Sequence, residues 1–151
     1  MLSQRDFSAE VAPTGMDQPC IQVNLRAVLP LPAALVGTWL AGDHTLSYRF
    51  RADGSYERHL DLVRGGEACV ARFHAWNRGS VRVLDDRRLV LVPLSGTVKS
   101  VDTCVAANNY ERPDTLANEV LHYRRLTAPD GAPALLLRGP AGGERLFRHA
   151  V

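Results

Sequence analysis

The sequence lacks the charge pattern of a nucleic-acid-binding protein. A single lysine, Lys99, stands against seventeen arginines, and sixteen acidic residues leave a formal net charge of only +2. Arginines such as Arg49 and Arg82 occur singly along separate segments, whereas nucleic-acid-binding domains gather basic residues on one face beside stacking aromatics. No nucleic-acid partner is therefore expected.

Long apolar segments and metal-type cysteine spacing are also missing. No apolar run reaches the roughly eighteen residues that cross a bilayer, and charged residues interrupt the first thirty positions, where a signal peptide needs an apolar core. Cys20, Cys69 and Cys104 follow no metal-ligand pattern. We expect a cytoplasmic protein with reduced thiols and no membrane contact; a Cys69–Cys104 bridge and export through an unseen leader stay open.

Catalytic motifs are absent as well. The chain contains no GxSxG, HExxH, CxxC, P-loop or GxGxxG sequence, and no histidine–carboxylate spacing indicates a metal site. We therefore predict neither a metal nor a cofactor. A catalyst built on this chain would position its substrate and offer one or two hydrogen-bond donors, and such a site leaves no motif.

What the chain does contain is a series of short strands. Residues 1–19 show no periodicity and predict a flexible N-terminal arm, and residues 20–151 predict one domain that opens with a strand at 20–28. Further strands are expected near 36–41, 44–51, 55–63, 67–77, 80–85, 88–93, 96–103, 119–126, 133–138 and 144–150. Between them lie turn sequences, namely Asp53-Gly54, Gly65-Gly66, Asn77-Arg78-Gly79, Asp85-Asp86, Asp130-Gly131 and Gly142-Gly143. This order predicts an all-β fold, an up-and-down antiparallel β-barrel of about 8–10 strands.

One connection is too long for a hairpin turn. Between Cys104 and Asn118 the chain has a loop of the kind that often binds ligands. Asp114 is a candidate cap for a short helix that would run through Leu116 and Asn118. A competing interpretation extends this helix to Leu126; we prefer a strand from Glu119, because Asp130-Gly131 then makes a hairpin with residues 133–138.

Side-chain alternation predicts which residues face the barrel interior. Leu46, Tyr48 and Phe50 share one face of their strand. Across the turn, the matching apolar set is Tyr56, Leu60 and Leu62. Arg58 falls on the same inner face. A buried arginine is costly unless an anionic group meets it, so Arg58 either pairs with an internal carboxylate or receives an anionic guest.

Two strands can be placed either way round. In residues 67–77 one face carries Arg72, His74 and Trp76, which would line a cavity beside Arg58, and the other carries small residues that would leave His74 on the surface. In residues 119–126, Tyr123 and Arg125 share a face and would grip a carboxylate if they point inward. Alternatively, Glu119 and Arg125 pair with each other or with neighbouring surface charges.

The segment Leu35-Val36-Gly37-Thr38-Trp39, followed by Tyr48-Arg49-Phe50-Arg51-Ala52-Asp53-Gly54-Ser55-Tyr56, resembles the opening of bacterial lipocalin-like domains of the calycin superfamily. The resemblance covers about residues 35–150 and implies a barrel that holds a small, mainly apolar molecule. It also implies structural roles for Gly37 and Trp39, and for Arg145 or Arg148, one of which would pack over the indole.

Several functions are compatible with these features. The first is binding of a small, mainly apolar molecule by Tyr48, Phe50, Tyr56, Leu60, His74 and Trp76, with Arg58, Tyr123 or Arg125 orienting its polar end. The second is a cofactor-free cyclase or isomerase that acts on a flexible, polyketide-type natural-product intermediate. Haem carriage through His74 or His122, and a filled barrel that acts through its surface, are further alternatives. An exposed edge near the N-terminal strand leaves a homodimer open.

Overall fold

The computed structural model describes residues 31–140 and 142–150, and most of them lie in antiparallel strands. Two predictions fall outside the described residues. These are the flexible N-terminal segment at 1–19 and the strand at 20–28, with the exposed edge that it would offer to a dimer. The elements are η1 (Ala33–Leu35), β1 (Gly37–Ala41), β2 (Leu46–Phe50), β3 (Ser55–Gly65), β4 (Val70–Val83), β5 (Arg88–Asp102), η2 (Ala106–Asn108), β6 (Tyr110–Pro113), β7 (Glu119–Thr127), β8 (Pro133–Arg138) and β9 (Glu144–His149).

The sheet closes on itself. Its order is β4-β3-β2-β1-β9-β8-β7-β5-β6, and β4 also pairs with β5, so that eight strands form a ring and β6 lies outside it. Each strand of the ring is antiparallel to its neighbours, and β9 returns to pair with β1 between His149 and Trp39. The predicted all-β, up-and-down antiparallel barrel is confirmed.

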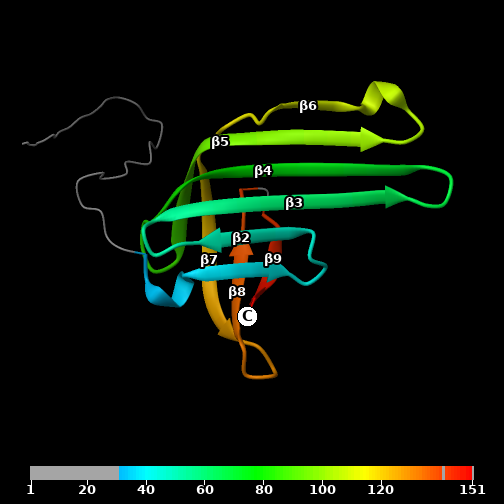
Figure 1. The fold of residues 1–151 in the computed structure, drawn as a ribbon. Helices are drawn as coiled ribbons and strands as arrows, with labels where there is room; N and C mark the ends of the chain where they lie inside the picture. The colour runs from blue at the N-terminus through cyan, green and yellow to red at the C-terminus, as the bar shows by residue number, and fades with distance from the viewer. Residues whose placement is uncertain (1–30, 141, 151) are drawn as a thin grey trace, which may run out of the picture.

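Three of the strands are much longer than the ring requires. Residues 88–91 of β5 pair with β7, whereas residues 97–100 pair with β6. Figure 1 shows β3, β4, β5 and β6 running side by side well beyond the rest of the barrel. We call this extension the arm; it comprises residues 59–65, 70–77, 96–102 and 110–113.

The turn predicted at Asn77-Arg78-Gly79 does not exist. The strands expected at 67–77 and 80–85 form the single strand β4, whose register against β5 shifts between Arg78 and Gly79. The strands expected at 88–93 and 96–103 likewise form the single strand β5. A Cβ at Gly79 would lie 2.0 Å from the carbonyl oxygen of Val92. This glycine therefore permits a close approach of two backbones at a β-bulge, not a reversal of the chain. The turns expected at Asp53-Gly54, Gly65-Gly66, Asp85-Asp86 and Asp130-Gly131 all join consecutive strands.

Alternating residues of the ring fill the barrel with side chains. Tyr48, Phe50 and Tyr56 are buried as predicted, and Leu60 packs against them. The cluster is continuous from Trp39 and Leu35 to Leu135 and Phe147, and all of these side chains are almost fully buried. The middle of the barrel is thus a packed core, because alternate residues of every strand point into it.

The long connection between β5 and β7 contains η2 and β6, neither of which was predicted. Residues 114–118 form no helix, so the short helix capped by Asp114 and its extension to Leu126 are both wrong. The preferred alternative is confirmed, because β7 begins at Glu119 and pairs with β8. The backbone of β6 pairs with Thr97–Ser100 of β5 instead of forming a free loop.

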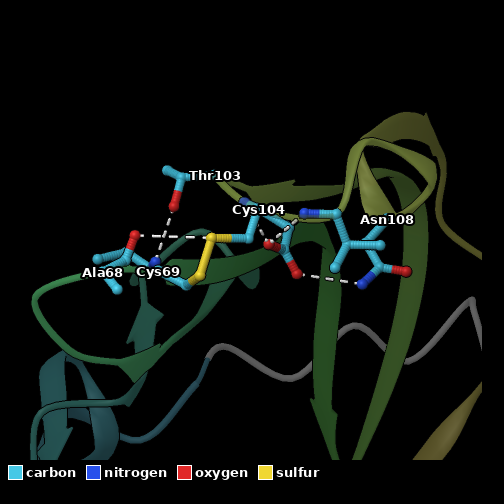
Figure 2. Close-up of a disulfide and its surroundings, with 8 residues drawn as sticks. Ala68, Cys69, Thr103, Cys104 and Asn108 are labelled. Carbon is cyan, nitrogen blue, oxygen red and sulfur yellow. Dashed lines mark hydrogen bonds between the residues drawn. A yellow bond between two sulfur atoms is a disulfide. The ribbon is translucent and has the colours of Figure 1, made fainter.

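A disulfide at the tip of the arm joins the β3–β4 turn to the loop that follows β5. Cys69 and Cys104 are bonded with their Cα atoms 5.5 Å apart, so the expectation of reduced thiols is wrong for this pair, and the bridge that the sequence left open is present. Figure 2 shows how the surrounding loop is held: Thr103 Oγ1 accepts the N–H of Val70, and Asp102 accepts the N–H groups of Cys104 and Val105. The side-chain amide of Asn108 and these two backbone donors hold the pKa of Asp102 below its ordinary value.

A histidine, and not the expected arginine, packs against Trp39. The ring of His149 meets the Trp39 indole edge-on with centroids 4.8 Å apart, and the indole N–H donates to the carbonyl oxygen of Leu35 at 3.0 Å. Arg145 instead pairs with Asp43, and Arg148 pairs with Asp130. His149 is therefore part of the packing around the first strand.

Candidate functional site

A cavity of about 330 Å³ lies at the barrel mouth, at the end from which the arm extends. Its walls come from β3, β4, β5 and the start of β7, and from the loop that precedes β7. One part is apolar and the other carries polar and charged groups. The lining residues are Tyr56, Arg58, Asn77, Leu91, Pro93, Thr115, Leu116, Ala117, Asn118, Glu119 and Pro140.

The bulge in β5 shapes this mouth. Gly79 pairs with Pro93 and Arg78 with Ser95, so Leu94 is the additional residue and its side chain is 73% exposed. With Leu94 turned out, Pro93 and Gly96 both stay on the inner face of the sheet, beside Tyr56 and Asn77. β-Bulges commonly re-aim side chains in this way next to functional sites.

Arg58 points inward, as the alternation predicted. Its Nε donates to the hydroxyl oxygen of Tyr48 at 3.3 Å, and its guanidinium carbon lies 5.9 Å from the centre of that ring. No carboxylate within residues 31–140 or 142–150 forms an ion pair with it. Burial by itself lowers the pKa of Arg58, but the Tyr48 phenol and the charges of Glu119 and Asp114 outweigh burial and raise it. The guanidinium therefore stays charged.

A second series of side-chain hydrogen bonds begins at Tyr56. Its hydroxyl donates to Oδ1 of Asn77 at 2.8 Å, and Nδ2 of Asn77 lies 3.5 Å from Oδ2 of Asp114. Burial, together with the nearby charge of Glu119, raises the pKa of Tyr56, so this phenol remains a neutral hydrogen-bond donor. Asn77 is thereby held with its amide across the cavity wall.

Glu119 completes the charged part of the cavity. It is the first residue of β7 and pairs with Leu91 of β5. Its side chain is half-buried and lines the cavity. Its negative charge contributes to raising the pKa of Arg58 and also that of Tyr56. One cation and one carboxylate thus face the same small space.

The structure divides the residues that were predicted to bind a ligand. Tyr56 and Arg58 line the cavity. Tyr48 lies beneath Arg58 and is only 4% exposed, and Phe50 is buried in the core. Leu60 packs against the core cluster at the start of the arm. These five residues share the inner face, but only two of them reach the cavity.

His74 and Trp76 lie on the other face of the sheet. Their strand is placed with Ala75 inward, where it is 6% exposed opposite Leu60. His74 pairs with Asp61 at 2.5 Å, and the His59 ring lies between His74 and Trp76. The interpretation that put His74 and Trp76 beside Arg58 is therefore wrong. His74 and the exposed His122 both point away from the barrel interior, which removes the haem arrangement considered above.

Tyr123 and Arg125 do not form a carboxylate grip. Tyr123 lies midway along β7 and packs against the core, but its hydroxyl donates to the backbone carbonyl oxygen of Asp85, in the β4–β5 turn, at 3.2 Å. Burial raises the pKa of Tyr123. Arg125 is exposed. The alternative pairing of Glu119 with Arg125 is also wrong, because no ion pair joins them.

Several cavity residues were missed from the sequence. Asn77 was assigned to a turn, and Glu119 was considered only as a partner of Arg125. The long loop after Cys104 was the one signal that pointed to the cavity, since its last residues, 115–118, form a wall. Leu91, Pro93 and Pro140 carried no signal of their own.

The comparisons with known proteins assign nothing further. No family model, no curated protein and no solved structure matches the chain. Within the described residues, no group of three or more histidine, cysteine or acidic side chains is arranged to hold a metal ion. No helix in this part of the chain is both long and apolar enough to cross a membrane.

Proposed function

We propose that this protein binds a small, mainly apolar molecule, and that it does so in the cavity at the barrel mouth. The observation that carries the proposal is a cavity of about 330 Å³ with an apolar wall of leucine, alanine and proline and a few fixed polar groups. Ligand pockets typically span about 300–1,000 Å³, and this cavity, whose lining is somewhat more polar than apolar, lies at the small end of that range. The packed core beneath the cavity supports a rigid, preformed floor.

Native mass spectrometry tests this proposal. Protein purified from its native organism should carry a small molecule that survives gentle ionisation. Replacing Ala117, an exposed residue of the cavity wall, with tryptophan should fill the cavity and abolish this extra mass. Ala107→Trp, on the exposed η2, is the matched control and should retain it. Equal occupancy in both variants would reject the cavity as the binding site.

A second candidate is a cofactor-free cyclase or isomerase acting on a polyketide-type intermediate. The observation that favours it is the meeting of Arg58, Asn77 and Glu119 at one cavity, since a cation, an amide and a carboxylate can position a flexible substrate and move a proton. Turnover of a linear precursor that is lost in Glu119→Gln, in a protein that still folds, would establish this activity over simple binding.

We also propose that the protein is lipocalin-like and cytoplasmic. The lipocalin-like affiliation is supported by a glycine-x-tryptophan first strand that opens an eight-stranded up-and-down ring. The Cys69–Cys104 disulfide argues against a cytoplasmic location, because disulfides persist mainly in oxidising compartments. Titration of free thiols in protein taken directly from native cells would distinguish the two environments.

A further inference from the structure

The cavity holds two opposite charges that do not touch each other. Arg58 and Glu119 both line it, yet no ion pair joins them. Partly buried charges are usually paired, because an unpaired charge loses its hydration without compensation. The two groups therefore leave a gap that a bound molecule can bridge.

Each charged group has unused hydrogen-bonding capacity. An arginine has five N–H donors, and among the described residues only the Nε of Arg58 is engaged, with Tyr48. No hydrogen bond joins the Glu119 carboxylate to another side chain in the described part of the chain. The cavity thus offers several cationic donors on one side and an anionic acceptor on the other.

The charge balance argues against a ligand that carries only one charge. Besides Glu119, Asp114 lies behind the Asn77 amide and acts on Arg58. A simple carboxylate would therefore meet one guanidinium and two acids, and a simple ammonium would meet a permanently charged guanidinium. Like charges brought together in a partly buried space repel strongly.

We propose that the ligand is a small zwitterion with an apolar side group, such as an α-amino acid or a compound with the same head group. Its carboxylate contacts Arg58, its ammonium group contacts Glu119, and its side group lies against Leu91, Pro93 and Pro140. The ammonium and carboxylate groups of such a molecule are attached to the same carbon, so that one small head group can offer hydrogen bonds to both side chains that line the cavity. This inference rests on the proposed binding function and specifies its ligand class.

Three probes with the same aromatic group test the contribution of each charge to binding. L-Phenylalanine carries both, 3-phenylpropionate only the carboxylate, and 2-phenylethylamine only the ammonium group. Isothermal titration calorimetry at pH 7 should give phenylalanine a dissociation constant at least about tenfold lower than that of either analogue. Equal constants, or tighter binding of a singly charged analogue, would overturn the inference.

Two substitutions test which residue reads which charge. In Glu119→Gln the advantage of phenylalanine over phenylpropionate should disappear, and in Arg58→Gln its advantage over phenylethylamine should disappear. Arg125→Gln, an exposed arginine outside the cavity, should leave all three constants unchanged. Each variant should lose one of these advantages and keep the other, whereas a general loss of folding would abolish both.

Failure of this inference is distinguishable from failure of the proposed function. If none of the probes binds but the Ala117→Trp variant loses a co-purified molecule, the cavity binds a ligand of another class and the zwitterion is rejected. If the probes do not bind and no molecule is carried by either Ala117→Trp or the unmodified protein, both proposals are rejected.

Discussion

Gly37 shows how one residue can be fixed by a partner far away in the sequence. Its φ of +134° lies where side-chain-bearing residues are strained, and a Cβ built on it would lie 2.2 Å from Nε2 of His149. The glycine therefore lets the His149 ring reach the Trp39 indole across the β1–β9 pairing. From the sequence alone Gly37 is predicted to lie in a strand, but no neighbouring residue indicates that it contacts His149.

Replacing Gly37 with alanine should destabilise the protein by about 1–3 kcal/mol, because the backbone is strained and the imidazole must move. Urea unfolding followed by fluorescence measures this change. Gly143→Ala is the control, since nothing lies within 4 Å of a Cβ at that position, and its effect should stay within about 0.5 kcal/mol. Similar losses in both variants would mean that the His149 contact does not restrict Gly37.

Residue identity predicted the cavity only in part. Arg58 was found because alternation puts an arginine among inward apolar residues, and the structure confirms that position. Glu119 was not found, because its role depends on which residue of β5 it pairs with. That register joins segments separated by many residues and is set by tertiary packing, which local periodicity does not encode.

At the scale of elements, the turns that were predicted correctly contain pairs of flexible or polar residues, such as Asp53-Gly54 and Gly65-Gly66. Asn77-Arg78-Gly79 has the same composition but lies inside β4. Gly79 is needed there because the backbone of β5 approaches closely. A glycine that allows close approach and a glycine that allows a turn look alike in a sequence, which is why β4 was divided into two predicted strands.

The disulfide should stabilise the arm in particular. It joins residues 35 positions apart at the tip, and closing a loop of this length typically contributes about 2–4 kcal/mol. A Cys69→Ser, Cys104→Ser double variant should lose that amount of unfolding free energy, which urea unfolding measures. Hydrogen exchange should accelerate in residues 96–102 and 110–113 first, because these strands have no barrel layer to retain them.

The control for this experiment is the exchange of β8 and β9, which lie in the ring. Their amides should be nearly as protected in the double variant as in the unmodified protein under native conditions. Uniform acceleration across arm and ring would show that the bridge stabilises the molecule as a whole and that the arm is not a separate unit.

At the scale of the whole molecule, β5 connects the two parts of the structure. Its first residues close the ring against β7, and its last residues carry the arm. Hydrophobic alternation predicted the ring, because closure satisfies every strand with two neighbours and buries one face of each. The arm was not predicted, since its strands are continuous with those of the ring and no break in composition separates them.

This arrangement predicts very different effects for one substitution at two places in β5. Leu89 is 0% exposed in the ring, opposite Leu121, whereas Leu94 is the 73% exposed residue at the bulge. Leu89→Ala removes buried side-chain volume from the shared core and should lower the free energy of unfolding by about 2–5 kcal/mol. Leu94→Ala removes no buried contact and should change the free energy of unfolding by no more than about 0.5 kcal/mol.

Thermal unfolding of the two variants, compared with the unmodified protein, measures both changes in stability. Equal destabilisation would mean that the bulge is packed against something, and that the stability of this protein is not concentrated in the ring.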